Sequence, residues 1–401
     1  MNGPWGFHEL QDVGVSVLDC EHKTPPDAGA GHPYVAIPSL VDGRLELTSV
    51  RRITDKQFSE WTRRTRPQGG DIIVTRRGRV GDSAVVPNGL QCAIGQNLVI
   101  LRSDGELVAQ RYLRWAARGP LWEREVNRLR NVGAVFDSLN VRDVARIRIP
   151  VPPLREQQAI AELLRALDDK IEADRLAVPL VQQLTDACFL QWRENLRDPE
   201  LTTFGEVAVI HGGSTPKTGV AEYWGGEHAW AVPRDITALS APYLFDTERH
   251  ITDAGLASIG NRLHPPGSIF MTSRATIGAF AVLQRPCAAN QGFIVAVPKD
   301  VVHRWFLFHE MRSRVDDMLD LANGSTFLEI SRGNFKNMLT VLPSSAELEQ
   351  LHELLDPLHG WCAALTHEAA RLTSLRDSVL PGLLSGDLQI RDAEKLVGEA
   401  V

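Results

Sequence analysis

The sequence has no long hydrophobic run, few cysteines and no cysteine pair at metal-binding spacing. No stretch of about 18 apolar residues occurs, which argues against a transmembrane helix. The first ten residues have neither a basic start nor an apolar core, so we expect no secretory signal and a cytoplasmic protein. The five cysteines are scattered without a CxxC pair, which predicts buried, reduced thiols and no metal site.

Motifs that mark catalytic centres are also missing. The chain has no GxGxxG fingerprint, no GxxxxGK[ST] phosphate loop, no HExxH and no GxSxG. It also lacks the Asn-Pro-Pro-aromatic tetrapeptide of enzymes that methylate amino groups. Its twelve histidines do not cluster. We therefore expect a recognition or scaffold protein rather than an enzyme, with no cofactor of its own.

The charge is unevenly distributed along the chain. The formal net charge is −7, yet residues 1–153 contain 21 basic and 17 acidic side chains. Residues 199–343 contain 12 basic and 14 acidic side chains, and most of the acidic excess lies in 154–198 and 344–401. A mildly basic first segment is compatible with nucleic-acid binding, whereas the acidity of the third segment weakens that case.

An internal repeat of about half the chain is the most informative feature. Arg52-Ile-Thr-Asp55 returns as His250-Ile-Thr-Asp253, and Gly70-Asp-Ile-Ile-Val-Thr75 returns as Gly267-Ser-Ile-Phe-Met-Thr272. Further residues recur in the same order: Arg77 and Arg274, Gly81 and Gly278, Cys92 and Cys287, Gln96 and Gln291. An ordered series of this kind predicts two similar domains.

Each half shows the same order of expected elements. Short apolar runs bounded by Gly, Pro and Asn predict strands at 71–75 and 98–101, and again at 269–272 and 293–297. Each half then ends with an apolar run into proline, followed by a long helical pattern. Capping patterns predict helix starts at Thr54, Thr252 and Ser344.

Two long helices are expected in 154–198 and 344–401. In the second, apolar residues recur at alternating steps of three and four, which is typical of a coiled-coil seam. A narrow seam needs a partner, and two helices of about 40 residues, roughly 60 Å long, can supply each other. The alternative is that each helix packs only on its own domain. Pro179 and Pro357 predict a kink or a local break in each helix.

These patterns predict an α+β protein. Two similar mixed α/β domains, 1–153 and 199–343, are separated by two long helices packed as an antiparallel coiled coil. The internal repeat then gives the molecule an approximate two-fold axis.

Several runs resemble a known family. Ile147-Arg-Ile-Pro-Val-Pro-Pro-Leu-Arg-Glu-Gln-Gln-Ala-Ile-Ala-Glu-Leu-Leu164 resembles the start of the conserved spacer helix in specificity subunits of type I restriction–modification systems. Leu380-Pro-Gly-Leu-Leu-Ser-Gly-Asp-Leu388 resembles the end of that family's second conserved helix. Gly213-Ser-Thr-Pro-Lys217 looks like the start of a target-recognition domain, for which the first copy offers only Lys23-Thr-Pro25.

The resemblance implies a DNA-sequence-recognition subunit. Each target-recognition domain would read one half of a split double-stranded DNA target. The helices would separate the halves and dock two methyltransferase subunits, which carry S-adenosylmethionine and methylate adenine. Restriction or translocase subunits can join such a complex. The competing hypothesis is a two-domain coiled-coil scaffold that joins other proteins without DNA specificity.

Candidate DNA contacts are basic and hydroxyl side chains, because arginine reads guanine and both types bind phosphate. The densest basic loop spans 75–79, and 272–274 occupies the same place in the second copy; either could also be a solvated turn. The candidates are Lys23, Thr75, Arg76, Arg77, Arg79, Thr215, Lys217, Arg234, Thr272 and Arg274.

Other residues receive different interpretations. Two domains that read different sequences should differ at reading positions, so residues that recur in both are interpreted as structural. These are Gly81, Gly278, Gln96 and Gln291. For partner docking we name helix positions expected to be exposed: Glu156, Gln157 and Glu347.

Overall fold

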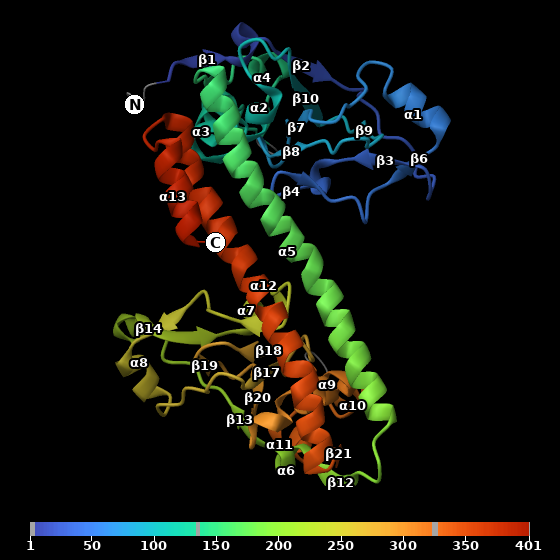
Figure 1. Ribbon diagram of the computed structural model, residues 1–401, viewed down its shortest axis with the longest axis vertical. Coiled ribbons are helices and arrows are strands. Elements are labelled where there is room, and N and C mark those ends of the chain that lie inside the picture. Colours follow the sequence, from blue (N-terminus) through green and yellow to red (C-terminus); the bar gives the residue numbers. More distant parts are fainter. Residues whose placement is uncertain (1–4, 134–136, 323–327, 401) are drawn as a thin grey trace. The chain divides into compact units, whose positions relative to one another are not determined.

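The structure, a computed structural model, describes residues 5–133, 137–322 and 328–400 (Figure 1). The chain divides into unit 1, residues 1–170 and 371–401, and unit 2, residues 171–370. This division cuts across the two long helices, α5 (Leu154–Glu194) and α12 (Ser345–Ser385). Each unit therefore contains one domain and one half of each long helix.

Unit 1 is built around an antiparallel sheet with the strand order β2-β10-β7-β8. A second sheet, β6-β3-β9, contains a parallel β3–β9 pair, and β1 pairs with β11. The strands are β1 (Phe7–Glu9), β2 (Val15–Asp19), β3 (His32–Val35), β4 (Leu40–Val41), β5 (Arg44–Leu45), β6 (Arg52–Ile53), β7 (Ile72–Thr75), β8 (Ser83–Val85), β9 (Ala93–Ile94), β10 (Leu98–Ser103) and β11 (Arg148–Pro150).

Unit 2 repeats this arrangement. Its sheets have the orders β13-β20-β17-β18-β15 and β16-β14-β19, with a parallel β14–β19 pair, and β12 pairs with β21. The strands are β12 (Glu200–Thr203), β13 (Ala208–Gly212), β14 (Trp224–Ala231), β15 (Tyr243–Leu244), β16 (His250–Ile251), β17 (Ile269–Thr272), β18 (Phe280–Leu283), β19 (Cys287–Ala289), β20 (Phe293–Pro298) and β21 (Leu339–Leu342). The internal repeat predicted from the sequence is confirmed at the level of strand order.

Short helices complete each unit. The capping boxes predicted at Thr54 and Ser344 are present, and the Thr252 hydroxyl caps α8 by accepting from the Gly255 N–H at 3.1 Å. The helices of unit 1 are α1 (Asp55–Trp61), α2 (Gln110–Ala116), α3 (Gly119–Leu129), α4 (Val141–Val144) and α13 (Ile390–Ala400). Those of unit 2 are α6 (Phe204–Val207), α7 (Pro233–Thr237), α8 (Asp253–Ser258), α9 (Arg304–Ser313), α10 (Val315–Asp320) and α11 (Arg332–Asn337).

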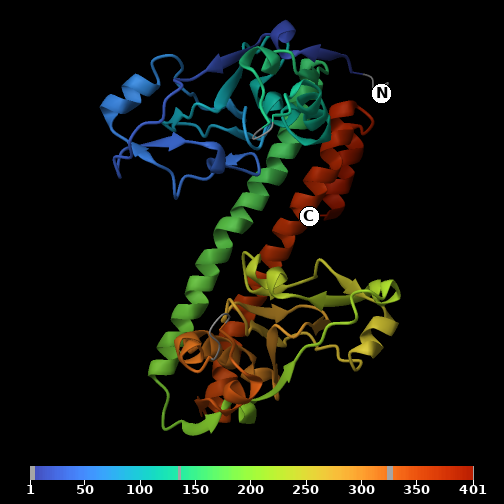
Figure 2. The same cartoon turned by 180° about the vertical axis from the view of Figure 1, so that it is seen from behind.

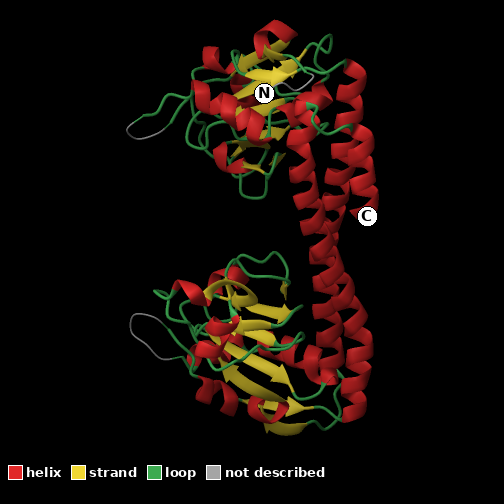
Figure 3. Ribbon diagram, turned by 90° about the vertical axis from the view of Figure 1, so that its left-hand side faces the viewer, coloured by secondary structure: helices red, strands yellow, loops and turns green. Residues whose placement is uncertain are grey.

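The two long helices run in opposite directions within each unit (Figure 2). In unit 2, the Cys362 thiol lies 3.7 Å from the carbonyl oxygen of Val178, and Glu347 accepts from the backbone N–H of Arg197 at 3.1 Å. A residue later in the chain on the α5 side thus contacts a residue earlier in α12, which confirms that the two helices are antiparallel. In each unit the helices also pack on the domain (Figure 3), so each long helix contacts both its partner helix and domain residues, and the alternative of packing on the domain alone is wrong.

Neither interior proline breaks its helix. Both α5 and α12 run unbroken for 41 residues through Pro179 and Pro357, so the local break allowed for in the sequence prediction does not occur. Both prolines are exposed. A carbonyl that loses its hydrogen bond beside an exposed proline can bind water instead, which lowers the cost of keeping the helix continuous.

Four of the five cysteines are buried thiols, as predicted, and Cys188 is half-buried. Burial raises the pKa of the Cys92 and Cys287 thiols to about 12, so both stay protonated. Among the described residues, no helix is long and apolar enough to cross a membrane.

Candidate nucleic-acid interface

The predicted basic loop is a tight turn that follows β7. The Thr75 N–H donates to the Asp82 carbonyl at 2.9 Å, and the Gly81 N–H donates back to the Thr75 carbonyl at 3.0 Å. Gly81 has a φ of +91°, and a Cβ there would lie 2.9 Å from both methyl carbons of Val126. Only glycine fits this backbone conformation and this space. The structural interpretation of Gly81 is therefore correct.

Unit 2 contains the same turn after β17. The Thr272 N–H donates to the Ala279 carbonyl at 2.9 Å, and the Gly278 N–H donates back to Thr272 at 3.1 Å. Gly278 has a φ of +90°, and its Cβ would lie 2.7 Å from a methyl carbon of Val315. The two turns are equivalent in backbone and in packing.

Three candidate DNA residues, Thr75, Arg76 and Thr272, are buried. Arg76 is 8% exposed, and its guanidinium donates to the carbonyls of Leu139 and Gln96 at 3.3 and 3.0 Å. The hydroxyls of Thr75 and Thr272 bond to backbone groups of their own turns. These side chains stabilise the turns and are not available at the surface.

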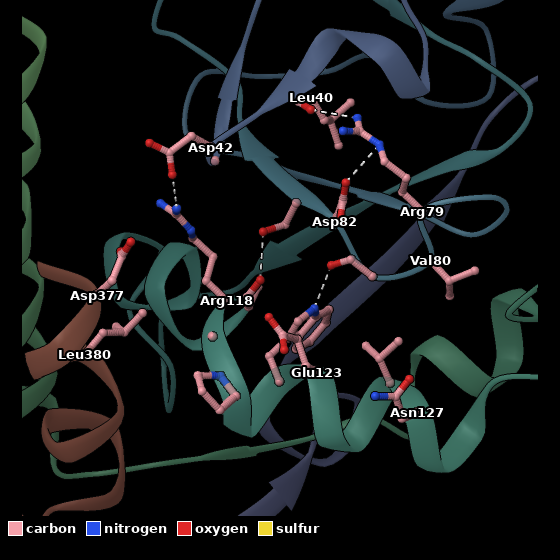
Figure 4. Close-up of a pocket in the computed structure, with 18 of the residues that line it drawn as sticks. Leu40, Asp42, Arg79, Val80, Asp82, Arg118, Glu123, Asn127, Asp377 and Leu380 are labelled. Carbon is pink, nitrogen blue, oxygen red and sulfur yellow. Dashed lines mark hydrogen bonds and ion pairs between the residues drawn. The ribbon is translucent and has the colours of Figure 1, made fainter. Parts of the chain in front are cut away.

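A second group of candidates is partly exposed but has partners within the domain. Arg79 donates to the carbonyls of Ile37 and Leu40 at 2.7 and 2.8 Å and pairs with Asp82 at 3.1 Å. It lines a pocket of about 700 Å³ (Figure 4). Arg274 pairs with Glu329 at 2.8 Å.

Thr215 is half-buried, and its hydroxyl donates to Gln291 Oε1. The other four candidates, Lys23, Arg77, Lys217 and Arg234, are exposed, and their side chains make no hydrogen bond or ion pair within the described part of the chain. The backbones of the two lysines are held by indoles. Trp61 Nε1 donates to the Lys23 carbonyl at 2.8 Å, and Trp224 Nε1 donates to the Lys217 carbonyl at 3.4 Å. Both ammonium groups can therefore bind phosphate without breaking an internal contact.

The expectation that Gln157 is exposed is wrong. Its side chain is fully buried, because its amide accepts from the Ala109 N–H at 2.7 Å and donates to the carbonyls of Leu107 and Pro152 at 2.9 and 2.8 Å. Glu156 is half-buried. Glu347 caps α12, and the Ser344 hydroxyl that donates to its carboxylate lowers its pKa.

The sequence analysis missed an exposed apolar face on the unit 2 half of α5. Leu176, Leu180, Leu184 and Leu190 are 60%, 65%, 47% and 54% exposed. Steps of four residues place the first three on one side of the helix. Their recurrence at this spacing, out of phase with the buried Val178, was the signal in the sequence. Exposed apolar side chains gathered on one helix face are a common feature of protein interaction sites.

The unit 2 half of α12 adds two further exposed apolar side chains. Leu354 is 45% exposed and Trp361 is 53% exposed, and a separation of seven residues places them on one face. These six residues of α5 and α12 are called the unit 2 helix patch below.

Comparison with known proteins agrees with the repeat. A model of the type I restriction modification DNA specificity domain matches residues 3–178 and, a second time, residues 197–372. The chain belongs to the type I restriction–modification DNA specificity family. The two matches to the specificity domain fall on the two copies of the repeat.

Individual similar proteins are also specificity subunits of type I restriction enzymes. The specificity-family chain is 32% identical over 161 residues to the type I restriction enzyme MjaIX specificity subunit of Methanocaldococcus jannaschii, covering 40% of this chain and 37% of that relative. It is 23% identical over 252 residues to the EcoR124I/EcoR124II specificity subunit of Escherichia coli, covering 59% and 61%. A crystal structure of the type I restriction–modification S subunit from M. genitalium has the same fold, with a TM-score of 0.64, 15% identity and 96% of both chains covered.

Proposed function

We propose that this chain is the DNA-sequence-recognition subunit of a type I restriction–modification complex and that each domain reads one half of a split double-stranded target. The observation that carries the proposal is the double match of the specificity-domain model, one match to each copy of the repeat. The copies share strand order and turn geometry but differ in surface residues, such as Arg79 in unit 1 and Thr276 at the matched position in unit 2. A shared frame with different surfaces suits two different half-sites.

The catalytic partners in this proposal are two methyltransferase subunits that carry S-adenosylmethionine and methylate adenine, and restriction or translocase subunits can join them. This chain contributes specificity and binds no cofactor. The unit 2 helix patch supports a docking role for the long helices in place of Glu156, Gln157 and Glu347. A chain with a net charge of −7 also needs basic partners to neutralise DNA phosphate, because that neutralisation dominates affinity.

The test is to sequence adenine methylation in genomic DNA from a host with no other methyltransferase that expresses the methyltransferase subunit with or without this chain. We expect one split, asymmetric adenine-methylated motif that depends on this chain. The proposal is wrong if both proteins accumulate in the host and no such motif depends on the chain.

A further inference from the structure

Arg249 is a surface arginine of unit 2 that stacks against two tryptophans. It immediately precedes β16, and its carbonyl accepts from the Trp230 N–H at 3.1 Å. Its guanidinium carbon lies 3.6 Å from the centroid of the Trp224 ring and 5.3 Å from that of Trp230. The two indoles are T-shaped to each other, with centroids 5.0 Å apart and planes at 80°. They form a corner that holds the guanidinium.

None of the N–H donors of Arg249 has a hydrogen-bond or ion-pair partner within the described part of the chain, and the residue is exposed. A guanidinium presents its N–H groups in its own plane as a rigid fork, and stacking on an aromatic face leaves the edge of that plane open. Holding the side chain in the folded protein reduces the rotamer entropy that binding would otherwise cost. Arg249 is therefore preorganised to bind two adjacent acceptor atoms.

The same two indoles hold the loop 214–217, which contains two of the candidate DNA contacts. Trp230 Nε1 donates to the Ser214 carbonyl at 3.0 Å, and Trp224 Nε1 donates to the Lys217 carbonyl at 3.4 Å. The stacked guanidinium and this loop are thus positioned by the same pair of rings.

Contacts of this loop extend to the other candidates of unit 2. The Thr215 hydroxyl donates to Gln291, which lines a surface hollow of about 370 Å³ together with Arg274. Arg249 is therefore connected through this loop to the surface that contains the candidate DNA contacts.

The matched place in unit 1 is built differently. Arg51 is the matched residue, because it immediately precedes β6 and its carbonyl accepts from the Tyr34 N–H at 2.9 Å. Arg51 is half-buried, and its guanidinium donates to the Pro25 carbonyl. Residues 23–31, which precede β3, contain no aromatic side chain that could replace Trp224. The stacked arginine is thus a difference between the two copies, as expected for a residue that contacts only one half-site.

DNA offers two kinds of adjacent acceptor pair. Guanine presents O6 and N7 on its major-groove edge, and the backbone presents phosphate oxygens. A guanidinium of fixed orientation can bind either pair through two parallel hydrogen bonds. We propose that Arg249 binds such an acceptor pair in the half-site of unit 2 and that Trp224 is the residue that positions it. This inference rests on the proposed DNA-recognition function.

The test uses the complex of the full-length chain and the methyltransferase subunit. Methylation of a library of randomised targets gives the base preference at each position, and salt titrations on the complex's own target give the salt dependence of binding. If Arg249 binds a guanine edge, Arg249→Ala should reduce discrimination at one guanine position of one half-site by about 10-fold. If it binds phosphate, the loss should be equal for all sequences, and the slope of log affinity against log salt concentration should become shallower by about 1.

Variants of Trp224 test the positioning role. Trp224→Leu keeps an apolar side chain but removes the aromatic face, so it should change the same readout as Arg249→Ala in the same direction, by about 3-fold, because the arginine must then be ordered on binding. Trp224→Tyr retains a ring for stacking and should restore most of this loss. A merely structural role would lower the melting temperature of Trp224→Leu without changing the base preference or the salt slope.

Lys299→Ala is the control for loss of a cation from unit 2. Lys299 is exposed, pairs with Glu206 at 3.9 Å and follows β20 where Pro298 pairs with β13. Gly212, at the opposite end of β13, lines the hollow that contains Gln291. Because Lys299 lies at the far end of these strands, its loss should change neither readout.

The outcomes separate the two proposals. A wild-type complex without a split motif would overturn the DNA-recognition function itself. A split motif whose base preferences and salt slope both survive Arg249→Ala would overturn the assignment of Arg249 alone. Calorimetric loss of methyltransferase affinity in Arg249→Ala, with base preference and salt slope unchanged, would place the residue in a protein interface and would also overturn it. If Trp224→Leu leaves both readouts unchanged, the positioning role of Trp224 is wrong.

Discussion

His309 and His359 face each other in the core of unit 2, with their Nε2 atoms 2.9 Å apart. Both are buried. Nδ1 of His309 lies 3.1 Å from the Asp186 carboxylate, and Nδ1 of His359 lies 2.8 Å from the Tyr243 hydroxyl. All four groups are satisfied when both rings are neutral: Tyr243 donates to His359, His359 donates to His309, and His309 donates to Asp186.

At the matched place, unit 1 has ion pairs in which the cations are arginines. Arg114 occupies the matched position to His309, on the helix that follows the central strand β10. It pairs with the buried Asp168, which also binds the buried Arg376 at 2.6 Å. In unit 2 the contact between the domain and the helix pair thus includes two histidines beside ion pairs such as Arg312–Asp186, whereas the matched contact in unit 1 consists of ion pairs.

Acid should therefore destabilise unit 2. Burial lowers the pKa of His359 to about 2, with a further contribution from His309, and burial also lowers the pKa of His309. Because the unfolded chain binds these protons below about pH 6.5 and the folded chain does not, stability is complete above pH 6.5 and falls as the pH drops. His359 should cost up to about 1.4 kcal/mol per pH unit well below pH 6.5, and the lowered pKa of His309 adds to the loss in the same direction. Thermal unfolding between pH 8 and pH 5 measures the slope.

His359→Gln isolates the effect, because glutamine can donate to His309 and accept from Tyr243 but does not titrate. We expect the slope to decrease by about 1.4 kcal/mol per pH unit. The matched control is Ala364→Gln, at an exposed position of the same helix, which removes no titratable group and should leave the slope unchanged. An identical slope in wild type and His359→Gln contradicts the assignment.

Arg376→Met should destabilise unit 1 strongly. Arg376 is 1% exposed and Asp168 is fully buried, and removing one member of a buried ion pair typically costs about 3 kcal/mol or more. Arg165→Met removes an exposed pair with Asp169 on α5 and should cost less than about 1 kcal/mol. Urea unfolding of both variants gives the comparison, and equal losses would show that burial does not set the energy.

The sequence predicted the features of the fold that depend on local patterns. The capping boxes at Thr54 and Ser344 follow from neighbours three residues away, and the pairing of the two long helices follows from the seam spacing. The repeat was visible because Gly81 and Gly278 tolerate no other residue in their turns.

The exposure of a polar side chain could not be predicted where its hydrogen-bond partners are distant in the sequence. Arg76 and Gln157 are residue types that are usually exposed, but both are buried here. The Arg76 guanidinium donates to the carbonyls of residues 139 and 96, and the Gln157 amide donates to the carbonyls of residues 107 and 152. No local sequence pattern indicates that a polar side chain will form hydrogen bonds with carbonyls so distant in the sequence.

Gly278→Ala should destabilise unit 2 more than Gly260→Ala. Both glycines have a left-handed backbone, with φ values of +90° and +87°, so alanine costs about 1 kcal/mol at either position. At Gly278 the new methyl would also lie 2.7 Å from Val315, whereas nothing lies within 4 Å at Gly260. The extra overlap should add about 1–3 kcal/mol. Chemical unfolding measures the stability lost in each variant. The double substitution Gly278→Ala/Val315→Ala should recover part of the extra loss seen in Gly278→Ala.

Arg77→Ala should weaken DNA binding by the complex without unfolding the domain. The Arg77 side chain is exposed and unpaired within the described structure, so its loss removes a phosphate contact and no internal bond. The slope of log affinity against log salt concentration should become shallower by about 1. Arg274→Ala should have a smaller effect, because Arg274 is already paired with Glu329.

Lys395→Ala, which removes one exposed charge from α13, is the control for Arg77→Ala and should leave the slope unchanged. Salt titrations of the complex on its own target provide the measurement. Unchanged slopes for both arginine variants would exclude these loops from the DNA interface.

Leu180→Asp should weaken binding of a methyltransferase subunit by about 30-fold or more while leaving this chain folded. Leu180 is the most exposed of the α5 leucines in the unit 2 helix patch, so a carboxylate there stays in water in the free chain. In a complex it would be buried without a partner, which should cost at least about 2 kcal/mol of binding energy at an interface centre. Leu396→Asp on α13, also exposed in the free chain, is the control. Calorimetric titration with the methyltransferase subunit distinguishes them: loss of affinity in Leu180→Asp alone, at an unchanged melting temperature, places the partner on this face, whereas equal affinities move the docking site elsewhere.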